Sequence, residues 1–258
     1  MELQRREFLE MAAGLAVTGS LGSALEAQAA PQPRFKAIAF DAFPIFDPRP
    51  VFRLAETLFP GKGEALGNAW RTRQFEYQWL RALSGHYADF TTTTESALVF
   101  AAKSLRLELT REKRVQLMQA YLELKAWPEV PSALGALKEA GLRLAFLSNM
   151  TRAMLNSCIN SAGLNGVFDH VLSTDQIRTY KPDPRAYQMA VDAFRLPRDE
   201  IVFAAFAGWD ACGAKWYGYP TFWVNRLSVP LEELAVTPDA VGKDLTALVS
   251  FAGTSIRA

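Results

Sequence analysis

Polar side chains follow four short apolar runs of the chain, at the points where strands of a sheet would end. Asp41 follows FKAIAF, Ser148 and Asn149 end LRLAFLSN, Lys181 comes after FDHVLS, and Asp210 comes after IVFAAFA. Parallel strands present their carboxyl ends at one edge of a sheet, where open α/β sheets bind their ligands. The sequence therefore predicts that carboxylate, hydroxyl, amide and amine groups converge on one spot, where a carboxylate can serve as nucleophile or base.

Five apolar runs of six or seven residues have the composition of strands buried on both faces of a parallel sheet. They occupy residues 35–40, 142–148, 168–173, 201–207 and 220–225. Helical patterns lie between them at residues 129–141, 151–163, 183–196 and 209–218. This alternation of strands and helices predicts an α/β fold built on a Rossmann-like, doubly wound parallel sheet.

The segment between the first two strand patterns, residues 51–125, carries only helical patterns. Three helices are expected: one in 64–85, one that starts with the capping-box spacing of Thr92 and Glu95, and one in 110–127. An all-helical insertion after the first strand predicts a cap domain over the strand tips. Residues 31–50 and 126–258 would then form the core domain, and the cleft between the two domains is the default ligand site.

The first thirty residues have the pattern of an export signal. Arg5-Arg6 precede Phe8-Leu9, a weakly apolar stretch rich in Ala and Gly follows, and AQA closes the segment. The pattern is similar to a twin-arginine signal and predicts a periplasmic protein whose mature chain begins near residue 30. An ordinary amphipathic N-terminal helix is the alternative. No later stretch reaches the roughly eighteen apolar residues of a membrane span, so no membrane anchor is expected after signal removal.

The composition favours a small-molecule partner. The chain has 258 residues, 50% of them hydrophobic, with 28 basic and 27 acidic side chains and a formal charge of +1. It is long enough to close one domain and a smaller second one. Its balanced charge creates no overall field that would recruit nucleic acid or an anionic membrane.

The cysteines and histidines do not cluster in the sequence. Cys158 and Cys212 each lie in a helical pattern, which favours buried thiols, although a periplasmic location would permit a bridge between them. His86 and His170 are isolated. Without a Cys or His cluster at ligand spacing, a zinc site is not expected.

Taken together, the motifs resemble those of the haloacid dehalogenase superfamily, and the chain is similar to its branch of type II (S)-2-haloacid dehalogenases. The resemblance rests on FDAF at 40–43, WRTRQFEYQWLRAL at 70–83, LSN at 147–149, YKPDPRAY at 180–187 and WDACGAKWYGYPT at 209–221. The cap motif at 70–83 discriminates between branches. So does Phe43, because superfamily phosphatases carry a second Asp there to protonate a leaving oxygen, and a halide needs no proton.

The resemblance implies covalent catalysis without a cofactor, in which short (S)-2-haloalkanoic acids become 2-hydroxy acids. Asp41 would attack the carbon that bears the halogen and form an aspartyl ester, which water then cleaves. Lys181 would keep Asp41 ionised and oriented, and Asp210 would activate or orient the water. Arg71 from the cap, together with Asn149, would receive the halide.

The resemblance also implies which side chains bind the substrate. Ser148 and the backbone amides beside it would bind the substrate carboxylate. Aromatic side chains would line the pocket around halide and substrate, namely Phe43, Phe90, Tyr187 and Trp209. No metal ligand is implied, and a homodimer is possible because relatives are commonly dimers.

Two departures from the family pattern bear on the second chemical step. Pro44-Ile45 stand where relatives carry a threonine that holds the nucleophile. Ala205 and Ala207 stand where relatives carry a serine and an asparagine that position water. The attacking groups are retained while support for the water is reduced, so breakdown of the ester is expected to be slow.

Two other functions remain open on the sequence. One is a Mg²⁺-dependent phosphatase of the same fold, which Phe43 disfavours. The other is a non-catalytic protein that binds carboxylates in the retained pocket.

Overall fold

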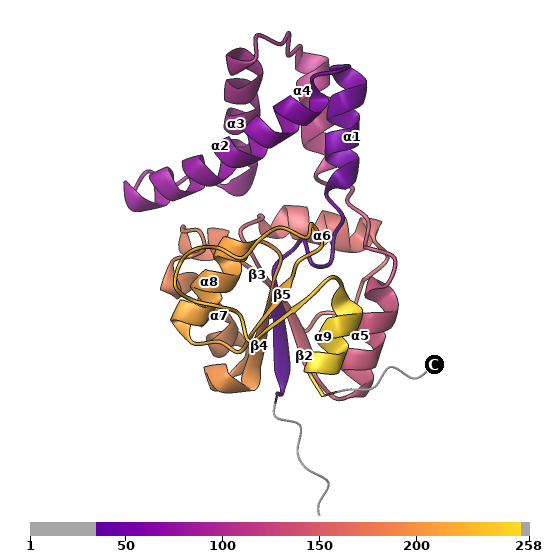
Figure 1. Ribbon diagram of the computed structural model, residues 1–258, viewed down its shortest axis with the longest axis vertical. Coiled ribbons are helices and arrows are strands. Elements are labelled where there is room, and N and C mark those ends of the chain that lie inside the picture. Colours follow the sequence, from indigo (N-terminus) through magenta and orange to yellow (C-terminus); the bar gives the residue numbers. More distant parts are fainter. Residues whose placement is uncertain (1–34, 254–258) are drawn as a thin grey trace, which may run out of the picture. The chain divides into compact units, whose positions relative to one another are not determined.

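A single sheet of six parallel strands forms the centre of the protein, in the order β3-β2-β1-β4-β5-β6 (Figure 1). The computed structural model describes residues 35–253, so the predicted export signal and the start of the mature chain lie outside the described residues. The strands are β1 Ala37–Phe40, β2 Arg143–Ser148, β3 His170–Ser173, β4 Ile201–Ala205, β5 Thr221–Val224 and β6 Ala240–Gly242. The predicted doubly wound α/β fold is confirmed.

The sixth strand, β6, is one that the sequence did not reveal. It pairs with β5 at the edge of the sheet, and none of its three residues is buried. The other five strands lie within the predicted apolar runs. β6 offers no apolar run, because it has only three residues and none of them is buried.

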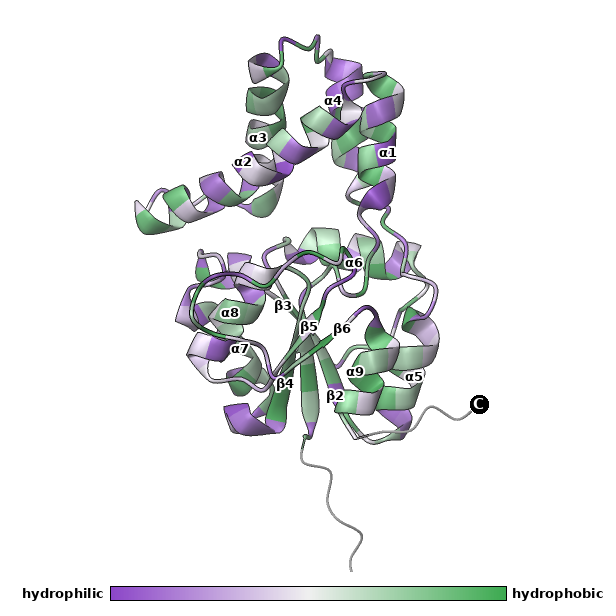
Figure 2. Cartoon of the chain, viewed as in Figure 1, coloured by the Kyte–Doolittle hydropathy of each residue, from purple (hydrophilic) through white to green (hydrophobic). Residues whose placement is uncertain are grey.

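Helices cover both faces of the sheet. One face carries α5 (Val130–Glu139), α6 (Arg152–Ser161) and α9 (Leu245–Phe251), and the other carries α7 (Pro184–Phe194) and α8 (Gly208–Tyr217) (Figure 1). Two short 3₁₀ turns, η1 (Thr174–Ile177) and η2 (Arg198–Glu200), precede α7 and β4. The strands are hydrophobic along most of their length (Figure 2), as expected for a sheet that is covered twice.

Strand alternation divides the core into two clusters. Ile38 and Phe40 point to the side of α5 and α9, whereas Ala37 and Ala39 point to the side of α7 and α8. The alanines on the second side are small, and the Tyr187 ring of α7 packs there, edge-on to Phe203, with ring centroids 5.4 Å apart. This packing places α7 and its tyrosine against the back of the strand tips.

The order of the strands reverses at β1. From β1 the chain builds outward through β2 and β3 on one side, and through β4, β5 and β6 on the other. Such a switch point leaves a crevice at the carboxyl ends of the central strands. Asp41 follows β1 directly and Asp210 lies in the first turn of α8, the helix after β4, so the topology places both acids at this crevice.

Four helices occupy the insertion after β1: α1 (Arg49–Leu58), α2 (Gly63–Leu83), α3 (Phe90–Ser104) and α4 (Arg111–Ala120). No strand lies in this insertion, all of which falls within the described residues. Sequence analysis missed α1, which begins with Arg49-Pro50, two residues before the expected start of the insertion. α2 packs along both α1 and α3.

The predicted capping box of Thr92 and Glu95 is wrong. The residue that caps α3 is Asp89, whose carboxylate accepts a hydrogen bond from the backbone N–H of Thr92 at 2.7 Å. Thr92 therefore lies in the first turn rather than before it. An aspartate three residues earlier offers the same cap with a charged acceptor, which the favourable dipole of a helix N-terminus strengthens.

Two linkers join the four helices to the core, and they pair with each other. Phe46 and Ala126 form an antiparallel bridge, flanked by a hydrogen bond of 2.8 Å from Asp47 N to Lys125 O. The Phe46 ring also stacks on Phe146 of β2 at 5.3 Å between centroids. The insertion is thus attached through a short, hydrogen-bonded stem directly beyond the loop that follows β1.

Both cysteines are free thiols, and both are buried, as the helical patterns indicated. The bridge between Cys158 and Cys212 that the sequence left open is not formed. Among residues 35–253, no helix is both long enough and apolar enough to cross a membrane.

The cap of α3 gives a test of this local structure. Replacing Asp89 by Ala removes the acceptor for Thr92 N, and the free energy of unfolding should fall by about 1 kcal/mol. Thr92→Ala is the matched control, because the Thr92 hydroxyl caps nothing, and it should change stability by less than half as much. Urea unfolding followed by circular dichroism measures both. Equal losses in the two variants would contradict the assignment.

Candidate active site

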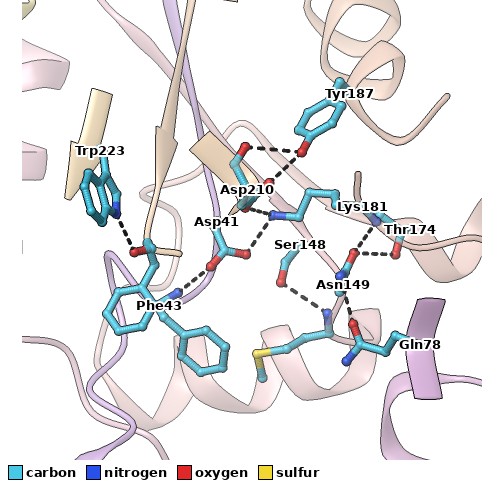
Figure 3. Close-up of polar contacts among 12 residues, drawn as sticks. Asp41, Phe43, Gln78, Ser148, Asn149, Thr174, Lys181, Tyr187, Asp210 and Trp223 are labelled. Atoms are coloured by element: carbon cyan, nitrogen blue, oxygen red, sulfur yellow. Dashed lines mark hydrogen bonds and ion pairs between the residues drawn. The ribbon is translucent and has the colours of Figure 1, made fainter. Parts of the chain in front are cut away.

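A buried lysine joins the two acids at the centre of the crevice (Figure 3). Lys181 Nζ lies 2.8 Å from Asp41 Oδ1 and 2.5 Å from Asp210 Oδ2. Lys181 and Asp210 are each 1% exposed, and Asp41 is 9% exposed. Charges this deeply buried require partners, because desolvation of an isolated ion is very costly. The three side chains therefore form one electrostatic unit, with Asp41 as its most accessible member.

The charges within this unit are strongly perturbed. Burial raises the pKa of the Asp210 carboxyl to about 6, since desolvation outweighs the attraction of Lys181. Burial alone would lower the pKa of Lys181, but the carboxylates of Asp210 and Asp41 outweigh it and raise the pKa. At neutral pH Lys181 is therefore an ammonium group and Asp210 is an ionised carboxylate. The pKa of Asp210 is close enough to neutral pH for it to act as a general base.

Tyr187 supports this unit from behind. Its hydroxyl donates a hydrogen bond of 2.7 Å to Asp210 Oδ1, and its side chain is fully buried. A Cβ at Gly213 would come within 2.5 Å of the Tyr187 hydroxyl oxygen, so position 213 has room only for glycine. The prediction that Tyr187 lines the pocket is wrong, because α7 directs its phenol at the rear of Asp210 and away from the cavity.

The loop after β1 holds Asp41 through backbone groups. Asp41 N donates to Ala204 O at 3.0 Å, which extends the pairing of β1 with β4 by one residue. The remaining carboxylate oxygen, Asp41 Oδ2, accepts one long hydrogen bond of 3.3 Å from Phe43 N. Oδ2 is therefore held by a weaker hydrogen bond than Oδ1, which Lys181 contacts at 2.8 Å.

Pro44 and Ile45, which offer no side-chain hydroxyl, are themselves fixed through their carbonyl groups. Arg226 Nη2 donates to Pro44 O at 2.6 Å, and Trp127 N donates to Ile45 O at 3.1 Å. The Trp127 indole N–H also donates to Phe43 O at 3.0 Å. Three successive carbonyls of this loop are thus held by residues of the core, which keeps the loop in place without a hydroxyl contact to Asp41.

A cavity of about 450 Å³ opens in front of Asp41, between α2 and α3 on one side and the strand tips on the other. Eight of the ten predicted site residues line it, and they are Asp41, Phe43, Arg71, Phe90, Ser148, Asn149, Trp209 and Asp210. The two others, Lys181 and Tyr187, lie behind the carboxylates that they contact. The structure therefore brings the predicted set together from both sides of the cavity.

The polar groups of the cavity wall favour an anion. Within the described residues the Arg71 guanidinium forms no ion pair or hydrogen bond, and it lines the cavity from α2. The Ser148 hydroxyl oxygen accepts a hydrogen bond of 3.1 Å from Met150 N, which leaves its own proton available to a ligand. The Trp209 indole N–H is buried and without a partner in the described part of the chain. Three donor groups, one of them the positively charged Arg71 guanidinium, thus belong to residues that line the same cavity.

The N-terminus of α8 offers little to a water molecule. Ala207 occupies the N-cap position and lines the cavity, and it provides no side-chain hydrogen bond. Ala205, the last residue of β4, is fully buried. Neither methyl group can hold water beside Asp210. Residues 35–253 also contain no group of three or more His, Cys, Asp or Glu side chains arranged to hold a metal ion.

Comparison with known proteins identifies the family. The model of the haloacid dehalogenase-like hydrolases matches residues 8–205. The chain belongs to this family. An (S)-2-haloacid dehalogenase of Pseudomonas sp. (strain YL) is 41% identical over 221 residues, which make up 85% of this chain and 95% of that relative.

Solved structures place the chain in the same branch of the haloacid dehalogenase-like hydrolases. The crystal structure of an L-2-haloacid dehalogenase matches with a TM-score of 0.83 at 46% identity, over 85% of this chain and 99% of that one. The L-2-haloacid dehalogenase from Xanthobacter autotrophicus, solved with chloropropionic acid covalently bound, matches with a TM-score of 0.77 at 33% identity, over 85% and 98% of the two chains. The predicted relationship to (S)-2-haloacid dehalogenases is confirmed.

One residue of the site, Gln78, was missed by sequence analysis. It lies on α2 seven residues after Arg71, so both side chains are on the same face of the helix, and both line the cavity. Its Oε1 accepts a hydrogen bond of 3.0 Å from Asn149 Nδ2 (Figure 3). The helical spacing of Gln78 from Arg71 and Gln74 was a sequence signal for it.

The raised pKa of Asp210 can be measured without turnover. Carbon-detected NMR of the aspartate carboxyl groups should show Asp210 titrating at about 6. In Tyr187→Phe the value should rise further, because the phenol donates to the ionised carboxylate and its loss favours the protonated form. Tyr217→Phe, which removes a hydroxyl bonded to Gln188 rather than Asp210, should leave the titration unchanged. An Asp210 titration near 3.9, the ordinary value for aspartate, would contradict this account.

Proposed function

We propose that the protein hydrolyses short (S)-2-haloalkanoic acids to 2-hydroxy acids through an aspartyl ester on Asp41, without a cofactor. The observation that carries the proposal is the pairing of Asp41 with the buried Lys181, at the floor of a cavity whose opposite wall bears the unpaired Arg71. A nucleophilic carboxylate and a separate receptor for a departing anion are what displacement of a halide requires.

In the first step, Asp41 Oδ2 attacks C2 of the substrate in line with the carbon–halogen bond. A new C–O bond forms, the carbon–halogen electron pair leaves with the halide, and C2 is inverted. Oδ2 is the attacking atom because Lys181 holds Oδ1 at 2.8 Å, whereas Oδ2 accepts, from residues 35–253, only the 3.3 Å hydrogen bond of Phe43 N. Proximity and orientation supply much of the rate, since the cavity holds the carbon against an oxygen that cannot rotate away.

The two anionic ends of the substrate are bound on opposite sides of C2. Ser148 and neighbouring backbone amides bind the substrate carboxylate on the core side. Arg71 meets the halide on the cap side, where negative charge develops in the transition state. Phe90 and Trp209 are apolar walls that exclude water from the reacting atoms, and both line the cavity.

In the second step, water attacks the carbonyl carbon of the Asp41 ester. Asp210 accepts the proton of the water, and the bond between that carbonyl carbon and Oδ2 breaks. Oδ2 takes a proton and leaves on C2 as the hydroxyl of the 2-hydroxy acid, and the water oxygen takes its place in the regenerated Asp41. Lys181 stabilises the negative charge on the carbonyl oxygen. Because Asp210 must be ionised to accept the proton, hydrolysis slows as the pH falls through about 6.

The same arrangement supports halide displacement better than phosphate transfer. Phe43 occupies the position of the phosphatases' second acid, and its ring packs on Phe206 with centroids 5.7 Å apart. Halide release from chloroacetate or bromoacetate, and phosphate release from p-nitrophenyl phosphate, each with and without EDTA, decide between the two reactions. Binding of 2-haloacids without any release would instead favour a carboxylate-binding protein.

The proposal extends to location and assembly. Export by a twin-arginine signal to the periplasm is proposed from Arg5-Arg6 and the stretch rich in Ala and Gly that follows them. Replacing Arg5 and Arg6 by Lys should keep the protein in the cytoplasm, which cell fractionation measures.

A homodimer is supported by the exposed side chains of Leu80 and Leu83 near the end of α2, 61% and 88% exposed. Light scattering measures the mass of the assembly.

The roles of Asp41 and Arg71 are tested by substitution. Asp41→Asn removes the nucleophile and Arg71→Ala removes the counter-charge of the halide, so each should lower halide release by on the order of 10²-fold or more without unfolding the protein. Arg81→Ala, at a half-buried position on the same helix that is not part of the cavity lining, is the control and should retain activity. Near wild-type release by Asp41→Asn, with deamidation excluded by mass spectrometry, would refute the covalent mechanism.

The alanines near Asp210 predict which step is slow. A burst of halide close to one equivalent per site should precede a slow steady rate, and intact-mass spectra should show an adduct on the peptide that contains Asp41. Ala205→Ser and Ala207→Asn combined should raise the steady rate more than the burst, because both groups would serve one water. Turnover with neither burst nor adduct would show that the water is activated without them.

A further inference from the structure

The buried side chain of Gln78 has an unused hydrogen-bonding group. Gln78 is 0% exposed, and its Nε2 has no hydrogen-bond partner among the described residues. An amide donor that is shielded from bulk water and lacks an acceptor is costly to bury. Such a group calls for an explanation, and one explanation is a ligand that supplies the acceptor.

The orientation of the Gln78 amide is fixed by the backbone of the core. Lys181 N, which can only donate, forms a 2.9 Å hydrogen bond to Asn149 Oδ1, and the Thr174 hydroxyl donates to the same oxygen at 3.3 Å. Asn149 must therefore present its NH₂ group to Gln78, whose oxygen accepts it. Turning the Gln78 amide over would set two NH₂ groups against each other. Its nitrogen consequently faces away from Asn149 Nδ2 (Figure 3).

Gln78 belongs to the wall of the substrate cavity. Arg71, Gln74, Phe75 and Gln78 line it together, at spacings that place them on one face of α2. Gln74 shows the contrast, because its Nε2 donates to the Thr94 hydroxyl and is satisfied within the protein. Of the two glutamines on this face, Gln78 alone has an NH₂ group without an acceptor in residues 35–253.

We propose that the Gln78 side-chain amide is a halide-binding group of the site, acting beside Arg71. The inference rests on the proposed function for the identity of the anion. The substrate presents two anionic ends, and the core binds the carboxylate through Ser148, so a donor on the cap helix is placed for the halide. Asn149 was predicted to bind the halide, but one of its N–H groups donates to Gln78 instead. The Gln78 amide would supply a donor to the halide in its place.

Halide binding without turnover tests the inference independently of catalysis. Chloride-35 NMR line broadening is measured with the Asp41→Asn protein, which cannot form the ester, and the part of the broadening that Arg71→Ala removes defines the site. Gln78→Met, which keeps the length of the side chain but has no N–H, should weaken chloride binding by about tenfold, the usual effect of losing one donor to a charged acceptor. Gln78→Leu should give the same loss if the Met variant does not fold.

Thr174→Val separates binding from positioning. It removes one of the two hydrogen bonds that hold Asn149 Oδ1 but leaves the Gln78 nitrogen intact. Chloride affinity in this variant should change by less than about twofold. If Thr174→Val weakened chloride as much as Gln78→Met, or if Gln78→Met left the affinity unchanged, Gln78 would only orient Asn149 and the inference would fail. Absence of any chloride broadening dependent on Arg71 would also overturn it.

The rate of the halide burst with different halogens supplies a second readout. Gln78→Met should lower the burst rate with 2-chloropropionate several-fold more than with 2-iodopropionate, because the smaller chloride concentrates its charge and depends more on N–H donors. An equal loss for both substrates would contradict a contact with the halide. If no 2-haloacid released halide but chloride still bound through Gln78, the dehalogenation proposal would fail while this inference stood.

Discussion

The ammonium group of Lys181, buried between Asp41 and Asp210, is the interaction on which the rest of the site depends. The parallel pairing of β1 with β4 places the two acids at adjacent strand ends, where without a cation their charges would repel and one would take up a proton. Replacing a single partner of so deeply buried an ionic cluster leaves an uncompensated charge. The second oxygen of Asp210 also needs a hydrogen-bond donor, and the Tyr187 hydroxyl supplies it. Gly213 leaves the room that this hydroxyl requires.

The cap is tied to this cluster at close range. Trp79 of α2 donates from its indole N–H to the backbone oxygen of Lys181 at 3.3 Å, and Gln78 accepts from Asn149 at 3.0 Å. Asn149 in turn accepts the backbone N–H of Lys181. The core therefore holds Lys181 through its charge and its N–H, and the cap holds its carbonyl oxygen. The position of α2, and hence of Arg71, is therefore coupled to the geometry around the nucleophile.

The sequence predicted those features that depend on burial along a strand, and missed those that depend on side-chain direction. Each of β1 to β5 lies in an apolar run, whereas β6 is a three-residue strand without a buried residue. Asp41 and Ser148 could be placed because a strand end fixes where they lie. Tyr187 could not, because its direction from α7 is decided by the space at Gly213. The role of Gln78 could not be predicted, because its orientation depends on a hydrogen bond between Lys181 N and Asn149. Both of those residues are far from Gln78 in the sequence.

The hydrogen bonds around Asp41 and Asp210 also indicate which of the two chemical steps is faster. Asp41 Oδ2 accepts one long hydrogen bond of 3.3 Å from Phe43 N, so little interaction energy is lost when Oδ2 forms its bond to C2 of the substrate. Both oxygens of Asp210 already accept short contacts, 2.5 Å from Lys181 and 2.7 Å from Tyr187, and water must bind to a lone pair that neither uses. Ala207, at the adjoining helix N-terminus, gives that water no second anchor. The geometry therefore favours formation of the ester over its hydrolysis, and the departures at residues 205 and 207 act on the step that has the least support.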